Sequence, residues 1–315
     1  MTVEIGLVLP TREAAMAGDP SARRLLDLAS RAEAAGFDSV WAGDAPFARP
    51  RFDPLTLLAG VAARTERIGV GTAIVLPVLR HPLLFAHAVA TVDRIAEGRF
   101  VLGVGAGWMR SEFDAVGARF DQRVGRLLET IAISRMLWRA ASDADPKPVS
   151  YSGRYWSFQD ISLFPPPSRP EGPPAWLGGS SEGAIRRAAI HFDGWFPTPP
   201  SPRAFADGWR TATEAAHERG RELDAAIYLT MNVDPDREKA ERETEAYALA
   251  YYGIPLEVMR NAQSYFVGGL EECAAWLRSF VDAGARHLVL RFATLDPDPH
   301  LDAVAERVLP AVRNP

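Results

Sequence analysis

The sequence predicts an α/β protein with the (β/α)8-barrel, or TIM-barrel, fold, built as a single domain over residues 1–315. Strand-like and helix-like segments alternate along the whole chain, and eight strand-like runs are each followed by a helix-like run. The length of 315 residues suits such a barrel, which takes about 250 residues, with room for insertions. Ligands of this fold bind at the mouth formed by the C-terminal strand ends, where we expect the insertions.

The predicted strands cover residues 3–9, 39–42, 68–76, 100–104, 175–178, 194–196, 226–233 and 287–292. The predicted helices cover residues 21–35, 54–64, 83–96, 123–138, 181–191, 202–219, 237–251, 271–283 and 301–312. In the first helix, Leu25, Leu28 and Ala32 share one face, as in an amphipathic helix. Glycines follow several of these helices, as Gly36 and Gly98 do, and are typical of helix ends.

A doubly wound sheet is the alternative arrangement of alternating strands and helices. That fold usually places a glycine-rich nucleotide turn after its first strand, but Leu9, Pro10 and Thr11 stand there. The later GVGAGW, residues 103–108, lacks the dinucleotide fingerprint because Trp108 occupies the sixth place, which requires glycine. The barrel is therefore favoured.

Two stretches interrupt the regular alternation, at about residues 140–174 and 252–266. The first is rich in proline and contains an aromatic patch that includes Tyr155 and Trp156. Long insertions in a compact domain are usually lids or binding loops, and the aromatic content favours ordered packing over a linker.

Composition and charge restrict the class of partner. A formal net charge of -5 leaves no basic excess for a nucleic acid. The single Cys273 cannot form an intramolecular disulfide, which is typical of a reducing compartment. The sequence shows no signal peptide and no apolar run of the ~18 residues that a membrane span needs. We expect a cytoplasmic protein that binds neither nucleic acid nor membrane.

Two neighbouring strand ends form a candidate cofactor site. The third strand ends in small residues, Gly71, Thr72 and Ala73, and the fourth runs into the glycines of GVGAGW. Small residues allow a flat ligand to lie against the backbone. Asp44 follows the second strand, where a carboxylate can bind a polar ligand edge or relay protons. A turn residue or helix cap is the alternative for Asp44.

The segment after the fifth strand suits a phosphate group. Gly178 and Gly179 give backbone freedom, and Ser180 or Ser181 can cap the following helix, whose N-terminus presents free N–H groups. An ordinary capped helix explains the same residues equally well. The six histidines lack metal-binding spacing and no Gly-x-Ser-x-Gly elbow occurs, so we expect no metal site and no hydrolase.

Four motifs together resemble the bacterial luciferase-like flavin and deazaflavin oxidoreductases. They are FDSVWAGD, GVGTAIVLPVLRHP, GRFVLGVGAGW followed by SEFDAVG, and PAWLGGSSEGAIRRAAIHFDGWFP, and they cover nearly the whole chain. The resemblance implies a (β/α)8 barrel, usually a homodimer, that binds coenzyme F420 or FMN at the mouth. The GGSSEGAIRR loop looks more like the deazaflavin branch, which favours F420.

The resemblance also implies roles for individual residues. It places a non-prolyl cis peptide at Ala73–Ile74, beside Thr72 and behind the cofactor ring. The remaining residues that it assigns to the cofactor are Asp44, Gly107, Trp108, Gly178, Gly179, Ser180 and Ser181. Ala45 departs from the family, since many relatives have histidine there, and this puts a histidine-assisted proton transfer in doubt. His81 of the RHP turn and Glu112 are further catalytic candidates, although His81 can be structural and Glu112 can be a helix-start carboxylate.

The implied activity is hydride transfer between C5 of F420 and a small organic substrate. The alternative is a two-component monooxygenase that uses reduced FMN and oxygen and depends on a partner reductase. A non-catalytic barrel that binds flavin or another small ligand is a third reading, because acid–base residues are scarce. Substrate specificity is expected in residues 47–52, 140–174 and 252–266.

Overall fold

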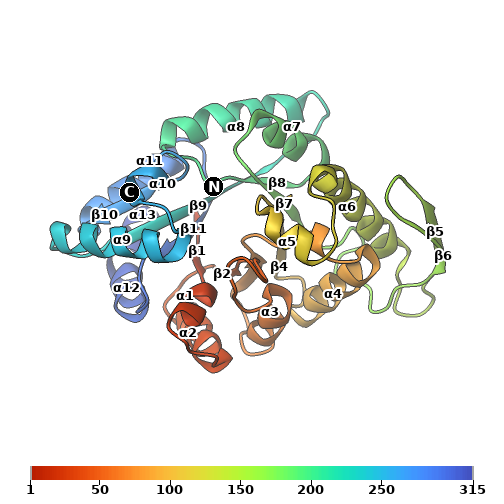
Figure 1. Cartoon of the computed structure of the whole chain (residues 1–315), viewed down its shortest axis with the longest axis horizontal. Helices are drawn as coiled ribbons and strands as arrows, with labels where there is room; N and C mark the ends of the chain where they lie inside the picture. The colour runs from red at the N-terminus through yellow and green to blue at the C-terminus, as the bar shows by residue number, and fades with distance from the viewer. Residues whose placement is uncertain (1, 314–315) are drawn as a thin grey trace. The chain divides into compact units, whose positions relative to one another are not determined.

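The computed structural model describes residues 2–313 and divides into two compact units (Figure 1). One unit comprises Met1–Ala42 and Trp176–Pro315, and the other comprises Gly43–Ala175. All eight predicted strands are present within them, most with ends shifted by no more than two residues.

Parallel strands form the framework of the first unit. β11 pairs with β1 and β9, β1 also pairs with β2, and β9 pairs with β8 and β10. The register of β11 on β9 sets Arg291 opposite Thr230. The strands are β1 (Glu4–Val8), β2 (Ser39–Ala42), β7 (Ala175–Gly178), β8 (Gly194–Phe196), β9 (Asp224–Val233), β10 (Tyr265–Gly268) and β11 (His287–Phe292).

Helices connect these strands, and α7 and α8 pack side by side (Figure 1). They are α1 (Thr11–Met16), α2 (Ala22–Ala34), α7 (Glu182–His191), α8 (Pro202–His217), α9 (Arg237–Tyr252), α10 (Leu256–Met259), α11 (Leu270–Asp282), α12 (Asp298–Ala303), the π-helical η3 (Val304–Val308) and α13 (Leu309–Arg313). Aromatic rings fill the core: Trp41 stacks on Trp176 with 5.4 Å between ring centroids, and Phe196 contacts both.

The second unit contains β3 (Gly69–Thr72) parallel to β4 (Phe100–Val104), and the antiparallel hairpin of β5 (Val149–Ser152) and β6 (Ser157–Ile161). Its helices are α3 (Pro54–Ala62), η1 (Pro77–Leu79), α4 (Pro82–Ile95), α5 (Arg110–Ala115), η2 (Phe120–Gln122) and α6 (Arg123–Ala140).

Two predicted elements differ in their bounds, and several further elements were not predicted. The third strand ends at Thr72 rather than at residue 76, because Asp44 binds backbone groups of residues 74 and 76. The last helix begins at Asp298 and is divided by a π-helical turn. The sequence also did not reveal α1, α5, α10, β10 or the hairpin.

The first insertion is ordered, as expected. The β5–β6 hairpin lies beside α6 (Figure 1), and Glu129 of α6 accepts hydrogen bonds from the backbone N–H groups of Tyr155 and Trp156, at 2.9 and 3.0 Å. The second insertion contains α10 and leads into β10.

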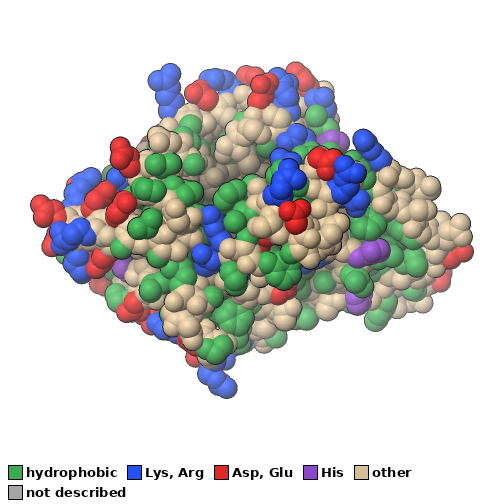
Figure 2. Space-filling view, viewed as in Figure 1, with side chains coloured by type: hydrophobic (Ala, Val, Ile, Leu, Met, Phe, Trp, Pro, Cys, Tyr) green, Lys and Arg blue, Asp and Glu red, His purple; other side chains and the backbone are tan. Residues whose placement is uncertain are grey.

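Acidic and basic side chains lie side by side over α9 (Figure 2), where Lys239 pairs with Asp234 and Arg260 pairs with Glu241. Among the described residues, no helix is both long enough and apolar enough to cross a membrane.

Candidate active site

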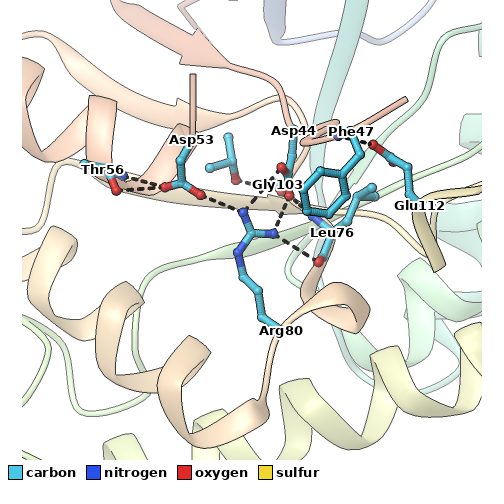
Figure 3. A network of polar contacts seen from close by, with 9 residues as sticks. Asp44, Phe47, Asp53, Thr56, Leu76, Arg80, Gly103 and Glu112 are labelled. Atoms are coloured by element: carbon cyan, nitrogen blue, oxygen red, sulfur yellow. Dashed lines mark hydrogen bonds and ion pairs between the residues drawn. The ribbon is translucent and has the colours of Figure 1, made fainter. Parts of the chain in front are cut away.

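Asp44, the first predicted site residue, lies in a network of ion pairs within the second unit (Figure 3). Its buried carboxylate pairs with Arg80 at 2.5 Å and accepts a hydrogen bond from the N–H of Leu76 at 2.9 Å. Its own backbone N–H donates to the carbonyl oxygen of Ile74 at 3.0 Å. Asp44 therefore holds the chain segment 74–76 that follows β3.

Arg80 joins Asp44 to a second carboxylate. Its Nη2 contacts Asp53 at 2.7 Å, and Asp53 caps the N-terminus of α3 by accepting from the N–H of Thr56 at 2.9 Å (Figure 3). Burial alone would favour neutral Arg80, but Asp44 and Asp53 hold its pKa above the ordinary value. Burial likewise opposes ionisation of Asp53, yet the Thr56 N–H and Arg80 hold the pKa of Asp53 below its ordinary value. The network keeps Arg80 charged.

The predicted cis peptide is confirmed at Ala73–Ile74. Thr72, buried beside it, donates its hydroxyl hydrogen to the carbonyl oxygen of Gly103 at 2.7 Å, which ties β3 to β4. This hydroxyl therefore joins the two strands, and only Ala73 and Ile74 of this segment are partly exposed.

Two glycines after β4 make room for protein side chains. A Cβ at Gly105 would lie 1.9 Å from Cδ1 of Ile74, so glycine is required for that close approach. Gly107 has a φ of +76°, and a Cβ there would lie 2.9 Å from the ring of Phe113. The sequence predicts that these glycines expose backbone to a flat ligand, but in the structure the space beside Gly105 is occupied by Ile74 and that beside Gly107 by Phe113.

Trp108 and Glu112 lie in the segment that follows these glycines. Trp108 is 65% exposed, and the guanidinium of Arg49 lies 4.9 Å from its ring centroid. Glu112 is buried at the start of α5 and accepts a hydrogen bond from the N–H of Phe47 at 3.2 Å (Figure 3). It also accepts one from the N–H of Ala48, at 3.2 Å. Glu112 thus anchors the loop that follows Asp44.

His81 has a structural position. It is the N-cap of α4, and its Nδ1 accepts a hydrogen bond from the N–H of Leu83 at 3.3 Å. The edge of its ring packs on Trp156 of the hairpin, with 4.9 Å between centroids. These contacts agree with the structural alternative for His81.

The predicted phosphate loop lies in the first unit, between β7 and α7. Ser181 is the N-cap of α7, and its Oγ accepts a hydrogen bond from the N–H of Ala184 at 3.3 Å. Gly179 has a φ of +122°, which favours glycine, and its carbonyl oxygen accepts from the indole N–H of Trp195 at 2.9 Å. Gly179, Ser180 and Ser181 are exposed, so this helix N-terminus is accessible to an anion.

Two arginines of α7 differ in their availability to that anion. Arg186 pairs with Glu182 on the helix surface, at 3.1 Å. Arg187 places its guanidinium over the first turn of the helix, where its Nη1 lies 3.1 Å from the point that a Cβ of Gly183 would occupy. The loop, the free helix N-terminus and Arg187 therefore fit the phosphate of a flavin-type cofactor.

The described part of the chain holds no group of three or more His, Cys, Asp or Glu side chains that could bind a metal ion. Cys273 is buried, and burial raises the pKa of its thiol.

Comparison with known proteins decides the family. The model of the luciferase-like monooxygenase family matches residues 3–254. The chain belongs to the luciferase-like monooxygenase family. A curated relative from Nakamurella multipartita, named F420-dependent glucose-6-phosphate dehydrogenase, is 31% identical, with 92% of each chain covered.

Solved structures of luciferase-like proteins share the fold. An F420-dependent secondary alcohol dehydrogenase in complex with an F420–acetone adduct superposes with a TM-score of 0.82, at 24% identity and 100% coverage of both chains. The oxygenating component of a diketocamphane monooxygenase from Pseudomonas putida, in complex with FMN, gives a TM-score of 0.78 at 21% identity, with 98% of each chain covered. The predicted (β/α)8-barrel fold is therefore confirmed.

Arg80 and Asp53 were not among the residues that sequence reasoning selected for this luciferase-like site. Both are charged and stand close to predicted helix starts, where such residues usually act as caps or solvated surface groups. The sequence offered no signal for this pairing, because Asp44 and Asp53 both precede Arg80 and other arginines, such as Arg64, stand between Asp53 and Arg80. The pairing depends on the fold, because Arg80 is 36 residues from Asp44 and 27 from Asp53.

Proposed function

We propose that this luciferase-like protein is a coenzyme F420-dependent oxidoreductase that exchanges hydride with a small organic substrate. The observation that carries the proposal is the identity of 31% over 92% of both chains with an enzyme named F420-dependent. Further curated relatives bear the same name. The accessible loop at Gly178–Ser181 supports binding of a phosphate-bearing cofactor.

Bound F420 supplies a carbon, C5, that accepts or releases hydride. The chain's own residues hold and orient that cofactor. In the first unit, the loop Gly178–Ser181 provides the phosphate site. In the second unit, Ala73, Ile74 and the exposed Trp108 provide a surface for a ring. Asp44 faces the ring edge in this proposal, since its Oδ1 accepts only the longer hydrogen bond from Arg80, at 3.3 Å, and retains acceptor capacity. Glu112 and His81 position the surrounding segments.

The same proposal covers the domain organisation, the oligomeric state, the location and the partner of the protein. We infer a single domain over residues 1–315, a homodimer, a cytoplasmic location and a reductase that restores the cofactor. The single Cys273, which is buried and forms no disulfide, supports a cytoplasmic location.

The test is a pair of fluorescence titrations of the purified protein, one with F420 and one with FMN. We expect tighter binding of F420. Preference for FMN would instead favour the two-component monooxygenase, for which the structural likeness to an FMN complex is the specific observation. Turnover of any substrate with either cofactor would exclude a non-catalytic binding protein.

Ser181→Ala, with Ser201→Ala as its control, tests the phosphate loop. Each serine is the N-cap of a long helix, with Oγ accepting from the third N–H along, at 3.3 Å for Ser181 and 3.2 Å for Ser201. Loss of either cap should cost about 1 kcal/mol of folding stability. Only Ser181→Ala should also weaken F420 binding, by about tenfold, which corresponds to 1.4 kcal/mol. Equal F420 affinity of the two variants would remove Ser181 from the cofactor site.

A further inference from the structure

A buried arginine stands at the C-terminal end of β11, within the first unit. Arg291 is 3% exposed and is the last residue but one of the strand. Its Nη2 donates to Oγ1 of Thr230 on β9 at 3.0 Å. Its Nε finds no hydrogen-bond acceptor among residues 2–313, and no described carboxylate lies within ion-pair distance of its guanidinium. Buried polar groups are normally hydrogen-bonded, so the Nε–H of this cation lacks the partner that such a group requires.

Tyrosine rings surround the guanidinium. The distances from its Cζ to the ring centroids are 4.5 Å for Tyr251, 5.2 Å for Tyr252, and 5.5 Å for both Tyr228 and Tyr247. Burial would favour the neutral guanidine, but these tyrosines hold the pKa of Arg291 well above its ordinary value. We call Arg291 with these four rings the tyrosine cage. The cage contains a permanent cation.

The walls of the cage differ in exposure. Tyr247 and Tyr251 are each 5% exposed and form the inner wall, where the hydroxyl of Tyr247 donates to the buried Glu13. Tyr228 and Tyr252 keep part of their surface accessible to solvent. The same is true of Tyr265, whose hydroxyl contacts Gln263 at 2.5 Å. Tyr228, Tyr252 and Tyr265 therefore form the partly exposed side of the cage, while the guanidinium itself is buried.

Glu13 does not supply the missing partner. Its carboxylate accepts a hydrogen bond from the hydroxyl of Tyr247, while the Nε–H of Arg291 stays unpaired. An N–H edge of a guanidinium matches the oxygens of a carboxylate or phosphate.

We propose that Arg291 and the tyrosine cage form a substrate subsite that binds an oxyanion group of the substrate. This inference rests on the proposed function, since it defines the substrates of that oxidoreductase as anionic. Two residues of the second predicted specificity segment, Tyr252 and Tyr265, border the subsite, which explains why that insertion would select substrates.

Benzoate is the first probe, because it combines a carboxylate with a ring that can stack on tyrosine, and neutral benzamide is its control. We expect saturable calorimetric binding of benzoate to the full-length protein and at least tenfold weaker binding of benzamide. Arg291→Lys, which keeps the charge but removes the planar fork, should weaken benzoate binding at least tenfold. Arg278→Lys, at an arginine that binds the carbonyl oxygen of Ala311, should not change it.

Tyr265→Phe keeps the test decisive if Arg291→Lys does not fold. It removes only a hydroxyl beside the subsite and should weaken benzoate binding severalfold, whereas Tyr151→Phe in the β5–β6 hairpin should have no effect. Equal binding of benzoate and benzamide, or unchanged benzoate binding in both Arg291→Lys and Tyr265→Phe, would overturn the proposal.

Competition and cofactor binding separate the remaining outcomes. Displacement of benzoate by inorganic phosphate would assign the subsite to phosphate esters, and failure of phosphate to compete would assign it to carboxylates. F420 titration of the same variants should give unchanged affinity. If the wild-type protein binds benzoate but not F420, the proposed cofactor fails while the oxyanion subsite stands.

Discussion

At the scale of single residues, Asp44, which follows β2, makes both an ion pair and a hydrogen bond to the backbone. Its carboxylate is buried against Arg80, and it also accepts the N–H of Leu76. Removal of one partner from a buried ion pair leaves the other charge uncompensated. The residue is therefore structural whatever it contributes to chemistry.

Asp44→Asn should lower the free energy of unfolding by about 3 kcal/mol, because it leaves the charge of Arg80 with only the half-exposed Asp53. Asp53→Asn is the matched control and should cost about 1 kcal/mol or less, since its side chain is 44% exposed. Chemical denaturation measures both. We further expect Asp44→Ala to lower turnover more than F420 affinity. Equal losses of turnover and affinity would reduce Asp44 to a positioning role.

At the scale of elements, Glu112 links the start of α5 to the loop after β2. The two N–H groups that it binds belong to Phe47 and Ala48, at the start of the segment 47–52 that we expect to contact substrate. A loop held in this way depends on a carboxylate, because an amide oxygen accepts the same hydrogen bonds more weakly.

Glu112→Gln should therefore raise KM for substrate severalfold while kcat and F420 affinity change little. The loop should also become more sensitive to limited proteolysis, since both hydrogen bonds weaken. Steady-state kinetics and mass spectrometry of the digest measure these effects. A large fall in kcat with unchanged KM would instead support the catalytic role that the sequence suggested for Glu112.

The contact of α12 with β9 should make stability depend on pH. Burial holds the pKa of His300 below its ordinary value of 6.5, and its Nε2 lies 2.9 Å from Oδ1 of Asn232. The folded protein therefore favours the neutral imidazole. The stability that this residue contributes is full above pH 6.5 and is lost as the pH falls below 6.5 toward the folded-state pKa.

Urea denaturation between pH 7 and pH 5 tests this expectation. The free energy of unfolding of the wild type should fall with pH by up to about 1.4 kcal/mol per unit more than that of His300→Gln, which cannot bind the extra proton. Parallel pH profiles of the two proteins would contradict it.

At the scale of the whole molecule, the alternation of eight strands with helices could be predicted from the sequence. Strands that are buried by flanking helices are short and apolar, and each flanking helix has an apolar face. The pattern of apolar residues along the chain therefore predicts the fold. The hairpin of β5 and β6 could not be predicted from the sequence. Its half-exposed strands carry little apolar periodicity, and backbone contacts to Glu129 hold it in place.

We expect the whole molecule to be a homodimer. Sedimentation equilibrium at micromolar concentration should give twice the chain mass of 34.4 kDa. A mass of 34.4 kDa that does not rise with concentration would show a monomer and contradict the expectation drawn from the family resemblance.

The sequence by itself predicted the barrel, because alternating apolar strands and amphipathic helices are local patterns of residues. Its motifs also indicated the family, and the family resemblance implied the cis peptide at Ala73–Ile74. Only the tertiary structure paired Arg80 with Asp44, filled the open side of Gly105 with Ile74, and surrounded Arg291 with tyrosines from β9 and α9. These contacts join residues far apart in the chain, and their energies depend on burial. Burial is a property of the folded chain, so no local pattern of residues could reveal them.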